Sequence, residues 1–132
     1  MMRFIEKNHR IVFYTAWLLL GLVQATAREL LDDDAYYHVY SEFLAWGYFE
    51  HPPMIAFLIK AGKALFDGEL GVRILIVLFN TGSLFLIEEL TRKKNPYLFY
   101  AICLSVAVAQ IGGSIAVPDV PLLFFVALFF YV

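Results

Sequence analysis

The sequence predicts an all-α integral membrane protein with three complete transmembrane helices and the start of a fourth. Hydrophobic residues make up 61% of the 132 residues, and the mean hydropathy is +0.72. A soluble domain of this size buries too little surface to hide so many apolar side chains, so a lipid bilayer is the expected solvent. The apolar residues also form long runs, most of them near the length of about 20 residues that a spanning helix needs.

The charge balance excludes nucleic acid as a partner. The chain has 10 basic and 12 acidic residues and a formal net charge of −2. It contains no basic cluster with interleaved aromatic residues, which is the usual mark of a nucleic-acid-binding surface. Membrane lipid is the partner that this composition indicates.

The first expected span covers residues 11–27 and follows the basic segment MRFIEKNHR. The same stretch also resembles a signal peptide, because the small residues ATA at 25–27 are typical of a cleavage site. We expect a retained helix, since the apolar run is long for the central region of a signal peptide.

Three further spans are expected along the rest of the chain. The second covers residues 70–90, with charged residues only near its two ends, and the third covers residues 97–117 without a charge. The fourth begins at residue 121 and is still apolar at Val132. A run that stops so early spans only part of a bilayer. We therefore expect residues 1–132 to be a single N-terminal transmembrane portion of a longer protein.

The basic residues predict the orientation. Positive charge precedes the first span and fills residues 92–94, between the second and third spans. Since cytoplasmic loops are enriched in Lys and Arg, the N-terminus and this turn are expected in the cytoplasm. The loop of residues 28–69 and the turn VPDVP at 117–121 are then extracytoplasmic.

The long loop is expected to contain two amphipathic helices at the membrane interface. The first would begin after Asp34 as N-cap and end at Gly47, and the second would open at the proline pair 52–53 and end at Gly68. In the first helix we expect an apolar face of Tyr36, Val39, Tyr40, Phe43 and Leu44 and a polar face of His38, Ser41 and Glu42.

Carboxylates gather on the predicted extracytoplasmic side. They are the acidic run at residues 32–34, Glu50 and Asp119. A carboxylate held among aromatic rings and lipid has a raised proton affinity, which suits general-base chemistry. These residues alone leave two interpretations open, a solvated acidic loop and a functional site.

The order of the motifs resembles the N-terminal third of the polyprenyl-phosphate-dependent glycosyltransferases of the GT-C fold. The motifs are DDDAYYHVYSEFLAWGYFEHPPM after the first span, GVR at the start of the second and PDVPLLFF at the start of the fourth. The most similar branch includes the lipid A aminoarabinose and galacturonic acid transferases, with the protein O-mannosyltransferases further off. This resemblance implies inverting transfer of a sugar from a polyprenyl-phosphate donor to a lipid, glycan or protein acceptor.

The resemblance also implies a location and a state. The active side would be the extracytoplasmic side of the bacterial inner membrane, with the N-terminus in the cytoplasm. Residues 1–132 alone are expected to be inactive, because later helices of the family complete the donor groove.

Roles for three acids follow from the resemblance. Asp33 corresponds to the proposed catalytic base, which would deprotonate the acceptor hydroxyl. Asp34 corresponds to the second acid of the family's pair and is shorter than the usual Glu. Asp119 corresponds to the acid of a turn that lies beside the site.

The donor phosphate would be met by other residues. Glu50 corresponds to an acid that helps some relatives to hold a divalent metal ion, and His51 stands where some relatives carry Lys. Arg73 is a candidate for contacting the donor phosphate, and its alternative is a snorkelling anchor at the interface. The neighbouring aromatic residues would either stack on the sugar or form an ordinary interfacial belt.

A function of a different class stays open at this point. The chain is also compatible with a non-enzymatic membrane subunit or a transporter fragment whose acidic loop binds a cation or relays protons.

Overall fold

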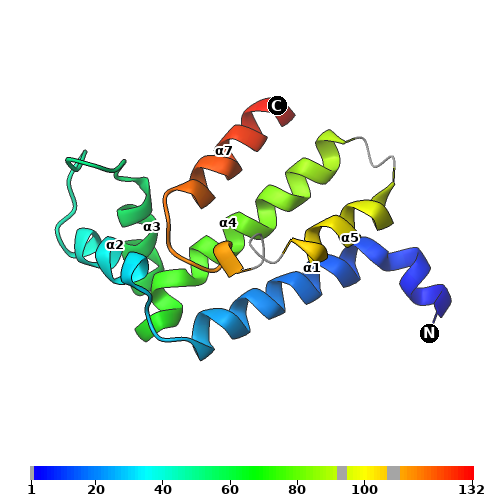
Figure 1. Ribbon diagram of the computed structural model, residues 1–132, viewed down its shortest axis with the longest axis horizontal. Helices are drawn as coiled ribbons and strands as arrows, with labels where there is room; N and C mark the ends of the chain where they lie inside the picture. Colours follow the sequence, from blue (N-terminus) through cyan, green and yellow to red (C-terminus); the bar gives the residue numbers. More distant parts are fainter. Residues whose placement is uncertain (1, 92–94, 107–110) are drawn as a thin grey trace.

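The computed structural model describes residues 2–91, 95–106 and 111–132. Within these ranges the regular secondary structure is entirely helical, which confirms the predicted all-α class (Figure 1). The helices are α1 (Met2–Ala27), α2 (Asp32–Glu42), α3 (Met54–Lys63), α4 (Gly68–Leu90), α5 (Pro96–Ser105) and α7 (Asp119–Tyr131).

Helix α4 is the central element of the fold. It packs against α1, α3 and α7, and Figure 1 shows it between α1 and α7. Among the described residues, Asn8–Ala27 of α1 and Gly68–Leu90 of α4 are long and apolar enough to cross a membrane. These two helices cover the first and second expected spans.

The expected third span is not one continuous helix. Helix α5 ends at Ser105, residues 107–110 lie outside the described residues, and the chain turns at residues 113–115. A Cβ atom on Gly113 would lie 2.0 Å from the side chain of Asn80, so this turn lies directly against α4. The prediction of a helix through residue 117 is therefore wrong, while the start of the fourth span is helical as expected.

A buried polar network joins α1, α4 and α5 near the N-terminal end of the fold. The side chain of Glu88 is completely buried and accepts hydrogen bonds from Arg10 (3.0 Å), Tyr14 (2.9 Å) and Tyr100 (2.9 Å). We call these four residues the Glu88 network. Because each donor meets the same carboxylate, the network satisfies a charge that would be very costly to bury alone.

Helix α3 lies unusually close to α4. A Cβ atom on Gly62 would lie 2.2 Å from the carbonyl oxygen of Gly71, so only glycine permits this approach. The backbone at Gly68 has φ +68°, a value that favours glycine, and α4 begins there. The expectation that Gly68 ends the second interfacial helix is thus wrong, because α3 already ends at Lys63.

The first interfacial helix also differs from the expectation. Helix α2 begins at Asp32 with Leu31 as N-cap, so Asp34 lies inside the first turn, and it ends at Glu42, before Gly47. Its buried residues are Asp34, Tyr37 and Ser41. The predicted polar residue Ser41 is therefore inside, and the predicted apolar face is largely exposed. The reason is the ion pair that Asp34 makes with Arg73 in the protein interior.

Candidate functional site

A completely buried ion pair lies at the base of the site. The Asp34 and Arg73 side chains both have 0% exposure, and Nη2 of Arg73 lies 2.5 Å from Oδ2 of Asp34, with Nε at 3.2 Å. Arg73 was expected at an open interface, either beside a donor phosphate or as a snorkelling anchor. In the structure its guanidinium instead faces the protein interior and pairs with Asp34.

The same guanidinium binds the end of α1 and the connection to α2. Nη1 donates to the carbonyl oxygens of Ala25 (3.2 Å) and Arg28 (2.7 Å), and Nη2 donates to that of Glu29 (2.8 Å). The last carbonyl oxygens of a helix have no hydrogen-bond donors within the helix. At the end of α1 the positively charged guanidinium of Arg73 supplies such donors.

Asp34 in turn joins α2 to the turn before α7. Its Oδ2 atom accepts from the backbone N–H of Leu31 (3.0 Å), which closes the first turn of α2. Its Oδ1 atom accepts from the backbone N–H of Ala116 (2.6 Å), 82 residues further along the chain. Both carboxylate oxygens are therefore engaged, and the described geometry makes Asp34 a structural residue rather than an open acid.

Tyr37 lies one turn beyond Asp34 on the same buried face of α2, within electrostatic range of acids that remain exposed. Tyr37 is only 5% exposed, and its hydroxyl lies 3.3 Å from Nδ1 of His51. Burial raises the pKa of the Tyr37 hydroxyl, and the negative charges of Asp33, Asp119 and Glu50 raise it further. Asp33, Asp119 and Glu50 lie in three different segments, so the fold brings three of the predicted site residues within electrostatic range of one hydroxyl. We call Asp33, Tyr37, Glu50, His51 and Asp119 the Tyr37 cluster.

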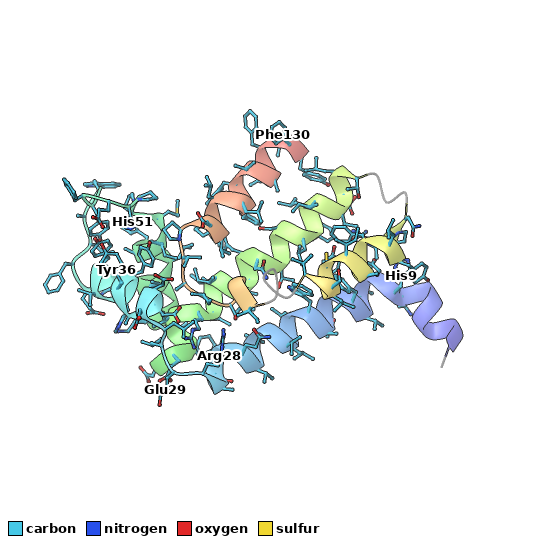
Figure 2. All side chains as sticks on the ribbon, viewed as in Figure 1. His9, Arg28, Glu29, Tyr36, His51 and Phe130 are labelled. Carbon is cyan, nitrogen blue, oxygen red and sulfur yellow. The ribbon has the colours of Figure 1, made fainter. Side chains whose placement is uncertain are left out.

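Tyrosine hydroxyls connect Glu50 to α2. The Tyr36 hydroxyl donates to Glu50 (3.3 Å) and shares a short hydrogen bond with that of Tyr40. The pKa of Tyr36 is raised, first by this bond to Tyr40 and also by the charge of Glu50. Figure 2 shows Tyr36 and His51 at the same end of the molecule, opposite His9.

The loop between α2 and α3 is shaped by a third tyrosine. The ring of Tyr48 stacks on that of Tyr40 with 4.0 Å between centroids, and its hydroxyl donates to the Tyr40 carbonyl oxygen (2.8 Å). Trp46 and Phe49 are almost fully exposed on this loop. An apolar groove of about 410 Å³ lies beside them, lined by Trp46, Pro53, Met54 and Phe57.

A larger groove of about 680 Å³ lies at the other end of the fold, between α1 and α4. Its lining includes Asn8, Arg10, Thr15, Thr81 and Phe85. None of the predicted site residues lines this groove, so its size does not connect it with the Tyr37 cluster.

An ionic group joins α2 to α3 on the outer side of the loop. Glu42 accepts a hydrogen bond from Lys63 (3.0 Å) and lies 3.5 Å from Lys60, and Lys63 also contacts His38. Burial lowers the pKa of His38, and the positive charge of Lys63 lowers it further. The hydrogen bond from Lys63 lowers the pKa of Glu42.

The divalent metal that the resemblance implied at Glu50 stays a prediction. In the part of the chain with described placement, no group of three or more His, Cys, Asp or Glu side chains is arranged to hold a metal ion.

Two functional features were missing from the sequence analysis. The sequence offers Tyr37 only as one aromatic residue among several, whereas in the structure its hydroxyl lies within electrostatic range of three acids. The pairing of Arg73 with Asp34 was also missed, and its signal was a lone cation at the start of an apolar run, since such a charge needs a counter-charge when buried.

Comparison of the chain with protein-family models, with curated proteins and with solved structures gives no significant match. The function of the Tyr37 cluster is therefore inferred from its own geometry and chemistry.

Proposed function

We propose that this chain is the N-terminal membrane portion of a GT-C-type glycosyltransferase, which transfers a sugar from a polyprenyl-phosphate donor to an extracytoplasmic acceptor. One observation carries the proposal: the Tyr37 hydroxyl lies 3.3 Å from Nδ1 of His51, and its pKa is raised by burial and by the negative charges of three acids from separate segments. Exposed carboxylates beside a histidine and a row of tyrosines supply the base, the hydrogen-bond partners and the ring surfaces that sugar transfer needs.

Asp33 acts as the general base in this proposal. It is exposed in the first turn of α2, whereas its neighbour Asp34 is buried and fully paired. Its carboxylate takes the proton of the acceptor hydroxyl while the acceptor oxygen bonds to the anomeric carbon. The bond from that carbon to the phosphate oxygen breaks, and the phosphate leaves with the electron pair. Attack from the face opposite the phosphate inverts the anomeric centre.

In this proposal His51 and the other two acids stabilise the charges that develop on the phosphate and on the sugar during transfer. Protonated His51, held near Tyr37, would donate a hydrogen bond to the departing phosphate, which replaces the role expected for Arg73. Positive charge develops on the sugar ring in the transition state. Asp119 and Glu50 are the exposed acids whose charge would stabilise it.

The apolar surroundings support a lipid-linked donor. The groove lined by Trp46, Pro53, Met54 and Phe57 begins two residues from His51 in sequence, and it offers an apolar wall for an isoprenoid tail. The helices α1 and α4 would cross the bacterial inner membrane, with the N-terminus in the cytoplasm and the α2–α3 region on the extracytoplasmic side.

A second function is favoured by the charge of the cluster. Asp33, Glu50 and Asp119 are three acids beside one histidine, and the nearby Arg73 is sequestered by Asp34. An excess of carboxylates attracts a cation and repels a phosphate. A membrane subunit or transporter portion that binds a cation or relays protons is therefore the alternative.

Replacement of Asp33 distinguishes the two functions. In the full-length protein, reconstituted in liposomes with a polyprenyl-phosphate sugar, Asp33→Asn should reduce transfer by about 10²- to 10⁴-fold, the usual contribution of a general base. Asp32→Asn is the matched control, because Asp32 is an exposed acid in the same helical turn. Transfer that survives Asp33→Asn, together with loss of cation or proton flux, would refute the enzyme and support the alternative.

A further inference from the structure

We infer that Arg73 and Asp34 are positioning residues, which hold the segments that carry Asp33 and Asp119 in one fixed arrangement around Tyr37. This inference rests on the proposed function for its catalytic consequence. Its structural part, the fixed arrangement, is independent of any activity.

The ion pair of Arg73 and Asp34 joins several segments of the fold. Arg73 in α4 binds carbonyl oxygens at the end of α1 and in the α1–α2 connection, at Ala25, Arg28 and Glu29. It also binds Asp34 in α2. One side chain therefore sets where α2 starts relative to both long helices.

Asp34 connects the ion pair to the two segments that carry Asp33 and Asp119. Asp34 is adjacent to Asp33 in the chain, and its Oδ1 atom holds the backbone N–H of Ala116, three residues before Asp119. A shift of Asp34 would thus move the proposed base and the second acid together. The two acids lie on segments that the chain connects only through more than 80 residues.

Arginine can make the hydrogen bonds of position 73, whereas lysine cannot. The Arg73 guanidinium uses Nε, Nη1 and Nη2 to reach four acceptor groups at once. A lysine ammonium is a single point charge with three donors and cannot reproduce this planar fork. Both partners are completely buried, so removal of either one leaves an uncompensated charge.

Glu88 offers a control that separates a positioning role from an ordinary contribution to stability. Glu88 is a completely buried carboxylate on α4, the helix that also carries Arg73, and it accepts a hydrogen bond from an arginine, Arg10. Its partners lie on α1 and α5, and none of them belongs to the Tyr37 cluster. A variant of Glu88 therefore reports the general cost of disturbing a buried polar network, without touching the proposed site.

The experiment measures the arrangement directly, by electron paramagnetic resonance distances between two spin labels. In the full-length protein in nanodiscs, Cys103 and any later cysteine are replaced by Ala, and labels are attached at Val39→Cys in α2 and Leu122→Cys in α7. Both positions are exposed, at 55% and 61%. The parent should give one narrow distance distribution.

The test variant is Asp34→Asn with Arg73→Met, in which both charges are removed together so that neither is left unpaired. We expect a broadened or shifted distance distribution and a fall of kcat by about tenfold or more, since a misplacement of about 1 Å can cost about 100-fold. The KM for the donor should change much less. Arg73→Lys, which keeps the charge, should broaden the distribution to a smaller extent.

Glu88→Gln should keep the parent distances and kcat, even where it lowers thermal stability. Unchanged distances in both the double variant and Arg73→Lys would overturn the inference, and the loss of transfer in Asp33→Asn would still support the proposed function. Altered distances with undiminished transfer would leave the fixed arrangement standing and would refute its catalytic consequence.

Discussion

The Glu88 network allows a quantitative prediction about stability. In Glu88→Ala, the Tyr14 hydroxyl, the Tyr100 hydroxyl and Nε of Arg10 lose their common acceptor. Each hydrogen bond to a charged group contributes about 1.5–3 kcal/mol, and the contributions within one network are not additive. Tyr100 keeps a second partner, Nδ1 of His9 at 3.0 Å. Arg10 is 29% exposed and keeps its ion pair with Glu89 (2.5 Å), and Tyr14 keeps the carbonyl oxygen of Leu84 (3.2 Å). We therefore expect a loss of about 2–3 kcal/mol in the free energy of unfolding, the size of one or two charge-assisted hydrogen bonds.

Glu88→Gln should cost less, about 1–2 kcal/mol, which is the size of one charge-assisted hydrogen bond. The amide oxygen can still accept from Arg10 and Tyr14. The amide nitrogen would face Tyr100, whose oxygen can accept while its proton goes to His9. The variant therefore loses a charge but leaves no buried donor unpaired.

The assay is equilibrium unfolding of the full-length protein in detergent, with tryptophan fluorescence as the signal. The difference between the two variants isolates the hydrogen bonds from the charge. Equal losses for Glu88→Ala and Glu88→Gln would refute the reasoning, because the charge alone would then account for the whole effect. A loss below about 1 kcal/mol in both would show that the network is exposed to water in solution.

Three further predictions concern the α2–α3 region. Gly62→Ala should destabilise the protein or separate α3 from α4, measured as a lower Tm, whereas Gly47→Ala, which has open space around it, should be neutral; equal effects would contradict the close approach. The pKa of His38 is lowered below its ordinary value of 6.5, so at this side chain the unfolded state binds more protons than the folded state. The free energy of unfolding should therefore fall as the pH drops through about 6.5 and below. The variant His38→Gln should flatten this part of a curve of Tm against pH, and an unchanged curve would contradict the prediction. Tyr48→Phe should speed proteolysis in the α2–α3 loop, since the hydroxyl holds the loop to the Tyr40 carbonyl oxygen, and unchanged cleavage would show that stacking alone holds the loop.

The positions of the long helices could be predicted from hydropathy alone. Residues 11–27 and 70–90 lie within α1 and α4, because an apolar run of this length has few other ways to satisfy its backbone. The helix boundaries in the long loop were less accurate. Asp34 was expected as an N-cap, but the N-cap is Leu31, three residues earlier, and Asp34 lies in the first turn, where it bonds both Arg73 and the backbone N–H of Leu31.

The identity of the buried acid could not be predicted. Successive residues of a helix point about 100° apart, so the start of α2 decides whether Asp33 or Asp34 faces the interior. That start depends on Arg73, which lies 39 residues away. The common side of the membrane expected for Asp33, Glu50 and Asp119 stays a prediction, and their shared electrostatic effect on Tyr37 was not expected.

The amino-acid sequence by itself determined the all-helical class and the two long apolar helices. These properties depend on composition and on short-range periodicity, which each segment carries alone. Tertiary structure decided which charges are buried, which remain exposed and which tyrosine they surround. A buried charge is stable only beside its partner, and the partner of Asp34 is brought to it by a different helix.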